Sequence, residues 1–508
     1  MQRSAFRQDR RTFIKTAAIA GGLALQHALG APFSWAGRQP TAEPTAPYGE
    51  NAEAGGVFDQ AEALTVRYLD DIEQRLQIRL KEKDQPFTDE LRMWLIRLAM
   101  QPLVAGAVSN SLEMIGDSKN ARERLSFIMP LVRWMSEPFL FPLETEGTPE
   151  EQKREIDKVF GLMARLRTQG LSTSLDNVGD ASLSSADAQA YQQYYLALVR
   201  AFIDSSKADQ LNMSLKLSAL VYDMDAALGD GAEAESKRRE IVEAFSKLLE
   251  TAAQAPDRSI FLRIDMEEYA YKDLTLRLFR EIVESNPSTA FDASGKLRLG
   301  VVIQAYLRDS ARDVQMLADW ARKNKLRAPI RLVKGAYLDF ERDAAADLGY
   351  PSPVWDHKPS TDANYEAVSA YMLLNLDAVD PAFATHNIRT QAHAMALAEA
   401  YGLSPNDAPI QMLYGMGDSI KHVIASMHRP MRAYIPAGSL ARGLKYAGRR
   451  FAELASSDNA LARTMRGDFS GVNTSAPVFT GKQDQADSED VRAILEQALA
   501  NKGESSHF

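Results

Sequence analysis

The chain has 508 residues, of which 45% are hydrophobic and 25% charged, a composition typical of a packed globular protein rather than a disordered one. It contains no cysteine, which excludes disulfides, thiolate metal sites, iron–sulfur clusters and cysteine nucleophiles. The net charge of -9 argues against nucleic acid as a partner.

Residues 1–30 are predicted to be an export signal. A basic segment, Asp9 to Lys15, precedes a short apolar stretch that ends in Ala28-Leu29-Gly30. The pair Arg10-Arg11, followed by Thr-Phe-Ile-Lys, resembles the twin-arginine signals that export folded proteins. We therefore expect a periplasmic protein, free or associated with the membrane surface on that side. The alternatives are an ordinary secretory signal or a disordered basic tail.

A linker and a helical arm are expected next. Residues 31–56 are rich in Pro, Gly, Ala and Thr, which is typical of a linker. In residues 57–155 apolar side chains recur on helical faces, and a second linker-like stretch covers residues 144–151. The two recurring sets are Leu64, Tyr68, Ile72 and Leu76, and then Leu91, Leu95, Leu98 and Val104.

Residues 156–480 alternate between short β-rich runs and amphipathic helical runs. Eight such βα repeats predict an α/β fold, a (βα)8 TIM-type barrel preceded by the helical arm and followed by a tail at residues 481–508. The alternative is an open, doubly wound sheet, although no G-x-G-x-x-G follows a strand. The expected strands are 171–175, 212–217, 260–264, 299–305, 330–333, 382–385, 410–413 and 432–435.

Polar side chains occur at the carboxyl ends of nearly all these strands, where barrel enzymes carry their chemistry. Any one of them is explained by solvation of a strand end, but a polar group at successive strands predicts an active-site rim. These residues are Asp176, Lys216, Asp265, Gln304, Arg331, Lys334, Tyr337, His386, Gln411, Tyr414 and Tyr434.

A predicted helix at residues 440–454 carries four polar side chains on one face: Tyr446, Arg449, Arg450 and Glu453. Adjacent guanidiniums suit a carboxylate ligand, although a solvated helix end would look similar. The seven histidines show no metal-binding spacing, so no metal site is expected. P-loop and G-x-S-x-G motifs are also absent from the sequence.

The run Arg331-Leu332-Val333-Lys334-Gly335-Ala336-Tyr337 stands among ordered motifs that cover about residues 165–480. This run is similar to the signature of FAD-dependent proline dehydrogenases, and the other motifs resemble those of the same family. The surrounding motifs are Leu215 to Leu220, Ile264 to Glu268, Val302 to Tyr306, Thr361-Asp362 with Tyr365, Ala384 to Asn387, Gly415 to Gly417, Tyr434 to Gly438, and Tyr446 with Arg449, Arg450 and Glu453.

The resemblance implies a distorted (βα)8 barrel whose last helix lies over the mouth. It implies that Arg449, Arg450 and Lys216 hold the carboxylate of L-proline, and that Asp265 and Tyr337 support the pocket formed by Leu413, Tyr434 and Tyr446. Glu453 would orient its neighbours. The implied FAD-binding residues are Asp265, Gln304, Arg331, Lys334, Gly335, Ala336, Thr385, His386, Asn387, Gln411 and Glu453, with Arg331 near flavin N5.

Three features depart from the family pattern. Asp180 stands where a Glu usually pairs with the first helix arginine, here Arg449, so a gate between them would be looser. Leu338 replaces an aromatic residue, and residues 455–471 form an insertion.

The resemblance implies hydride transfer from C5 of proline to flavin N5, giving 1-pyrroline-5-carboxylate, with a quinone as the electron acceptor. Without a cysteine nucleophile, no fused aldehyde dehydrogenase is expected. The alternatives are the same flavoenzyme acting on another cyclic or N-alkyl amino acid, and a catalytically silent amino-acid-binding protein. Tyr434 argues against 4-hydroxyproline, because its ring would crowd a hydroxyl at C4.

Overall fold

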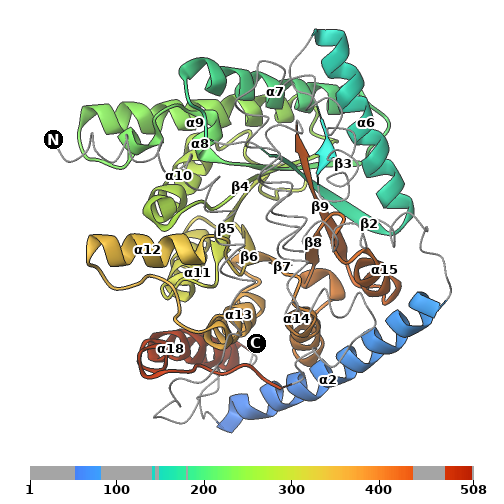
Figure 1. Ribbon diagram of the computed structural model, residues 1–508, viewed down its shortest axis with the longest axis vertical. Coiled ribbons are helices and arrows are strands. Elements are labelled where there is room, and N and C mark those ends of the chain that lie inside the picture. The colour runs from blue at the N-terminus through green and yellow to red at the C-terminus, as the bar shows by residue number, and fades with distance from the viewer. Residues whose placement is uncertain (1–51, 82–139, 144–147, 179–180, 439–474, 506–508) are drawn as a thin grey trace, which may run out of the picture.

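The structure is a computed structural model that describes residues 52–81, 140–143, 148–178, 181–438 and 475–505 (Figure 1). Several predicted features lie outside these residues: the export signal, most of the linker, the second apolar set of the arm, and the gate residue Asp180. The predicted helix with Tyr446, Arg449, Arg450 and Glu453 also lies outside them.

Eight parallel strands form a closed ring. Strands β2 to β8 pair in chain order, and β9 pairs with both β8 and β2, which closes the barrel. A short strand β1 (Phe141–Pro142) pairs with the last two residues of β9, beyond the part of β9 that pairs with β8. The strands are β2 (Leu171–Asn177), β3 (Gln210–Leu215), β4 (Ser259–Ile264), β5 (Leu299–Gln304), β6 (Ala328–Val333), β7 (Val379–Ala384), β8 (Ile410–Leu413) and β9 (Met431–Gly438). The predicted barrel is confirmed, and the open sheet is wrong.

Helices surround the barrel, as Figure 1 shows. They are α6 (Pro149–Thr168), α7 (Ser185–Asp204), α8 (Leu217–Leu220), α9 (Ala232–Ala253), α10 (Lys272–Ser285), α11 (Ser310–Lys323), α12 (Leu338–Leu348), α13 (Lys358–Leu374), α14 (Ile388–Ala400) and α15 (Asp418–Ser426). Three 3-10 helices, η1 (Met224–Ala227), η2 (Tyr269–Tyr271) and η3 (Pro405–Asp407), lie in the connections.

On β3, the side chains that point into the barrel are polar and those that point toward the helices are apolar. On β3, Leu211, Met213 and Leu215 are fully buried and belong to the hydrophobic core. The alternate residues are polar: Asn212 Oδ1 accepts a hydrogen bond from Ser174 Oγ on β2 (2.8 Å), and Ser214 meets a side chain from β6. Because strand side chains alternate, the polar set points into the barrel and the apolar set packs under the helices.

The helical arm begins with α2 (Ala52–Lys81), which packs along α14 and reaches α15. Its predicted apolar face is confirmed, since Tyr68, Ile72 and Leu76 are buried and Leu64 is half-buried. The helix begins at Ala52, inside the stretch that the sequence suggested as a linker.

The stretch at residues 144–151 also contains a helix start. Helix α6 begins at Pro149, where Thr148 and Glu151 form a capping box. A threonine followed by a proline resembles a linker in composition, but the same residues are favoured at the start of a helix.

The predicted C-terminal tail contains a long helix, α18 (Lys482–Ser505), which packs against α13 and α11. Arg308 Nη1 contacts the carboxylates of Asp484 (2.8 Å) and Asp487 (2.7 Å), and the ring of Phe479 lies 5.1 Å from that of Trp355. None of the helices in the described ranges is long and apolar enough to cross a membrane.

Candidate functional site

The predicted rim residues lie at one mouth of the barrel, because all eight strands run in the same direction. Two halves of this mouth can be distinguished by the strands that build them. Strands β2, β3, β4 and β9 carry or precede Asp176, Lys216, Asp265 and Tyr434. Strands β5 to β8 carry or precede Gln304, Arg331, Lys334, Thr385, His386 and Gln411.

Arg331 connects the two halves. It is only 3% exposed, and its Nη2 atom donates to Ser214 Oγ on the opposite side of the barrel (2.8 Å) and pairs with Asp265. Its guanidinium lies 5.0 Å from the ring centre of Tyr434, whose hydroxyl donates to Asp265 Oδ2 (2.8 Å). The result is a fixed positive charge inside the mouth, held by a carboxylate and two hydroxyl-bearing side chains.

Asp176 and Lys216 lie next to this cluster. Burial, together with the like charge of Asp265, raises the pKa of Asp176 to about 6. Burial opposes the charge of Lys216, but the neighbouring Asp176 and other acidic groups raise the net pKa of Lys216, so it stays cationic. Burial and the two carboxylates raise the pKa of Tyr434, which keeps its hydroxyl as a hydrogen-bond donor.

The second half of the mouth has unused hydrogen-bonding capacity. The side-chain amide oxygens of Gln304 and Gln411 are buried and have no hydrogen-bond partner among the described residues. Buried polar atoms are normally paired, so these two indicate a ligand with donor groups.

Gly335 brings the backbone of the signature loop unusually close to another side chain. Its φ is +124°, and a Cβ added there would lie 2.4 Å from the ring of Tyr306. Only glycine combines this conformation with this approach. Gly335 and Ala336 are both exposed, so their backbone is open to a ligand above the mouth.

Lys334 is the second cation of this half. Its Nζ atom pairs with Asp362 on α13, donates to Thr390 Oγ1 on α14 (3.1 Å) and lies 5.3 Å from the ring centre of Tyr365. Burial lowers the pKa of Lys334, and Asp362 opposes this effect. Two helices therefore fix the position of this ammonium group.

The start of α14 positions three further predicted residues. Asn387 Oδ1 caps the helix by accepting from the Thr390 amide (3.2 Å), and the Asn387 amide donates to Thr385 Oγ1 (3.1 Å). His386 Nε2 accepts from the Leu413 amide (3.1 Å), so the ring proton of His386 lies on Nδ1.

This side of the mouth offers the amide oxygens of Gln304 and Gln411, which lack partners in the described part of the chain, and the close-lying backbone of Gly335. It also offers two cations and the N-terminus of α14. Together these groups fit a planar polar ring with an anionic tail, which is the chemistry of a flavin dinucleotide. Asp265 is in direct contact with both Arg331 and Tyr434. Lys216 is close enough to Asp265 and Tyr337 to interact with them electrostatically. Leu413 is half-buried at the end of β8. The roles assigned to these residues remain predictions.

The sequence reasoning missed three contact residues: Ser214, Asp362 as the partner of Lys334, and Thr390. Asp176 was noted at the rim but given no role. The polar–apolar alternation of Asn212 to Leu215 could have identified Ser214 as an inward residue. No sequence signal links Thr390 to Lys334, because 56 residues separate them.

Comparisons with known proteins identify the family of this chain. The sequence profile of the family described as proline dehydrogenase matches residues 161–463. The chain is 32% identical over 300 residues to the bifunctional protein PutA of Salmonella typhimurium (57% of this chain, 22% of the relative). It is 26% identical over 298 residues to proline dehydrogenase 1 of Bacillus subtilis strain 168 (59% of this chain, 83% of the relative).

Among solved structures, PutA from Bdellovibrio bacteriovorus inactivated by N-propargylglycine matches with a TM-score of 0.64 and 25% identity, covering 84% of this chain and 47% of that chain. The chain thus spans less than half of that protein and less than a quarter of the Salmonella relative. Since the family profile covers more than half of the residues, this chain belongs to the proline dehydrogenase family.

Proposed function

We propose that the protein is a FAD-dependent proline dehydrogenase that oxidises L-proline to 1-pyrroline-5-carboxylate, the first step of proline catabolism. The observation that carries this proposal is Arg331, a buried cation between the side of the mouth with paired charges and the side where the amide oxygens of Gln304 and Gln411 have no partner among the described residues. The family membership and the similarity to a Bacillus protein named proline dehydrogenase support it.

In this proposal the β5–β8 half holds the cofactor. Gln304 and Gln411 would pair with the polar edge of the ring system, and Lys334 with the anionic tail. The rest of the FAD site would be lined by Gly335, Ala336, Thr385, His386 and Asn387. Asp265 and Glu453 are proposed to contribute to it as well. The flavin supplies a hydride acceptor. Arg331 would place a fixed positive charge beside the ring system, where it would stabilise negative charge that develops during the reaction.

The β2–β4 and β9 half would hold the substrate. Lys216, with Arg449 and Arg450, is proposed to bind the carboxylate, and Tyr434, Tyr446 and Leu413 to enclose the ring. Loss of hydride from C5 of the neutral amine leaves positive charge on the ring nitrogen. An ionised Asp176 would stabilise this charge, because opposite charges attract strongly in a partly desolvated site. Loss of the nitrogen proton then gives the neutral imine.

We also propose that a quinone takes the electrons and that the protein is exported to the periplasm. The motif at Arg10-Arg11 supports export by the twin-arginine route, and a membrane quinone would be reachable from that side. A gate between Asp180 and Arg449 remains part of this proposal.

The experiment is a spectrum followed by a titration. Purified full-length protein should be yellow, and its flavin absorbance should bleach without oxygen when L-proline is added. The panel should include D-proline, N-methylglycine and trans-4-hydroxy-L-proline, followed by reoxidation with a soluble quinone analogue. A colourless protein that takes up no FAD would contradict the proposal. If N-methylglycine bleached the flavin faster than L-proline, the substrate assigned here would be wrong.

A further inference from the structure

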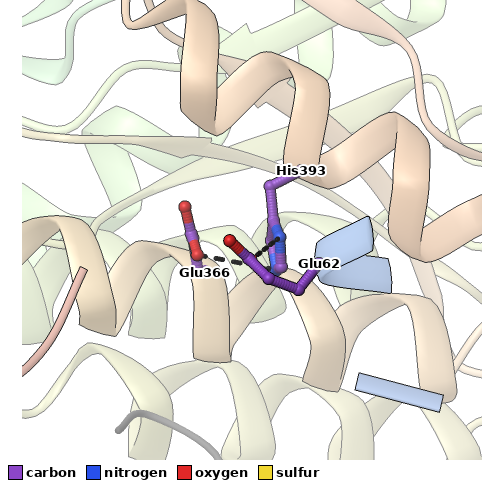
Figure 2. Close-up of side chains that lie close together, drawn as sticks. All are labelled: Glu62, Glu366 and His393. Carbon is purple, nitrogen blue, oxygen red and sulfur yellow. Dashed lines mark ion pairs between the residues drawn. The ribbon is translucent and has the colours of Figure 1, made fainter. Parts of the chain in front are cut away.

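A buried polar cluster joins the arm helix to the barrel. Figure 2 shows Glu62 from α2, Glu366 from α13 and His393 from α14 converging, with potential ligand atoms within 4.8 Å of one another. With Thr65 and Arg389 these residues form what we call the inner junction. It lies outside the mouth and is not used by the proposed reaction.

Arg389 is the centre of the inner junction. Its Nη1 and Nη2 atoms donate to both oxygens of Glu62 (2.9 and 2.7 Å), and its Nε atom lies 3.3 Å from Glu366 Oε1. A metal ion would have to compete with this guanidinium for both carboxylates. The arrangement is therefore a network around one guanidinium that spans three helices.

Glu62 is the charged partner of Arg389. Burial raises the pKa of Glu366 to about 8, so this side chain is largely protonated at neutral pH, and burial lowers the pKa of His393 to about 3. Thr65 Oγ1 donates to Ala61 O (2.7 Å) and so accepts from His393 Nδ1 (3.1 Å). The arm thus supplies the negative charge and a hydrogen-bond acceptor to α14.

The inner junction lies directly beside the partners of Lys334. On α13, Asp362 and Glu366 are four residues apart and share one face, with Asp362 on Lys334 and Glu366 on Arg389. On α14, Arg389 and Thr390 are adjacent: Arg389 donates to Glu62, and Thr390 accepts a hydrogen bond from Lys334. A shift of either helix would therefore move both contacts together.

A second contact between α2 and α14 provides an internal comparison. Arg67 pairs with Glu399 (2.6 Å), and Arg429 also contacts Glu399 (3.1 Å). Arg67 is 59% exposed, and Glu399 lies in the last turn of α14, three turns from Arg389. This outer junction attaches the arm without reaching Lys334 or its partners.

We propose that Glu62 is a positioning residue for the cofactor. Through Arg389 it fixes α13 and α14 where Asp362 and Thr390 hold Lys334, so that docking of the arm and binding of FAD favour each other. The inference rests on the proposed FAD-binding function of Lys334. Linkage requires the coupling to be reciprocal: the arm strengthens FAD binding, and FAD strengthens arm docking by the same factor.

The test compares Glu62→Gln, which keeps the size of the side chain, with Arg67→Ala at the outer junction. Full-length protein stripped of flavin is titrated with FAD at pH 7, and the Kd is read from flavin fluorescence. Hydrogen exchange of the α2 amides is then measured with and without FAD. In the parent protein FAD should slow this exchange.

We expect Glu62→Gln to raise the Kd for FAD about five- to tenfold and to reduce the protection of α2 by FAD to the same extent. Arg67→Ala should leave the Kd within about twofold, because exposed ion pairs contribute little. If Glu62→Gln left the Kd for FAD unchanged while hydrogen exchange of α2 became faster, the inner junction would only attach the arm to the barrel. That result would overturn this inference but not the proposed function. A parent protein that binds no FAD would overturn the proposed function as well.

Discussion

The two halves of the barrel mouth are built differently. On the β2–β4 and β9 side the polar groups have protein partners, as Asp265 has in Tyr434 of the same side and in Arg331, which reaches across from β6. On the β5–β8 side, Gln304 and Gln411 keep buried amide oxygens without partners in the described part of the chain. An unpaired buried polar atom costs about 1–3 kcal/mol. The first half therefore holds its own geometry, whereas in the proposed function FAD would complete the second.

The largest expected effect is at Gly335, in the half that is proposed to bind FAD. In Gly335→Ala the new methyl group would meet the ring of Tyr306 at a positive φ, so the loop or the ring must move. Overpacking and strain of this kind cost about 3 kcal/mol together, and we expect FAD affinity to fall at least about a hundredfold. The measurement is the flavin content of the purified protein and its Kd for added FAD.

Gly349→Ala is the matched control for this substitution. Gly349 also has a positive φ (+72°), but a Cβ there would have no atom within 4 Å. It should lower stability by about 1 kcal/mol and leave the flavin bound. If the two variants kept flavin equally well, the assignment of Gly335 to the cofactor half would be wrong.

The second prediction tests the residue that joins the halves. Arg331→Met keeps much of the side-chain volume but removes the charge and leaves Asp265 and Ser214 without this partner. We expect flavin reduction by proline to slow about a hundredfold or more, with flavin still bound through the other contacts of its half. Anaerobic stopped-flow absorbance measures this rate.

Arg327→Met serves as its control, because Arg327 precedes the same strand at the opposite end and pairs with Asp380 (3.7 Å). Its reduction rate should match that of the parent. Equal rates in Arg331→Met and Arg327→Met would show that the buried charge does not assist the reaction.

The smallest effect is expected from the half whose charges are already paired. Asp176 ionises as the pH rises through its raised pKa of about 6, so the flavin reduction rate should rise over the same interval. In Asp176→Asn this step should disappear, and the rate at pH 8 should fall only about three- to tenfold. Asp209→Asn, at an exposed ion pair with Arg167, should keep the step. A step near pH 6 that persists in Asp176→Asn would assign it to another group.

The sequence predicts the barrel well, because its signal is local. Each strand is a short apolar or alternating run bounded by polar residues, and each strand end places its side chain at the same mouth. The arm helix was also predicted from the spacing of Tyr68, Ile72 and Leu76. The sequence does not predict that this helix docks on α14. The contacting residues Glu62 and Arg389 lie 327 residues apart, and neither is unusual in its own segment.

The protonation of the carboxyl groups at the barrel mouth could not be predicted from the sequence either. Asp176 and Asp265 look alike in the sequence, but only their convergence inside the barrel, with burial of Asp176, shifts a pKa. The unpaired oxygens of Gln304 and Gln411 likewise follow from three-dimensional packing and not from residue type.

The fully buried carboxylate of Asp484 on α18 has a consequence for the order of synthesis. It accepts hydrogen bonds from the amides of Asp356 and His357 (both 3.1 Å), which precede it by 128 and 127 residues, and it pairs with Arg308. At about 5–20 residues per second, ribosomes reach Asp484 roughly ten seconds after the groups that it satisfies. During that interval the amides of Asp356 and His357 and the guanidinium of Arg308 lack this partner, so we expect the wall beside α13 to complete its packing late in synthesis.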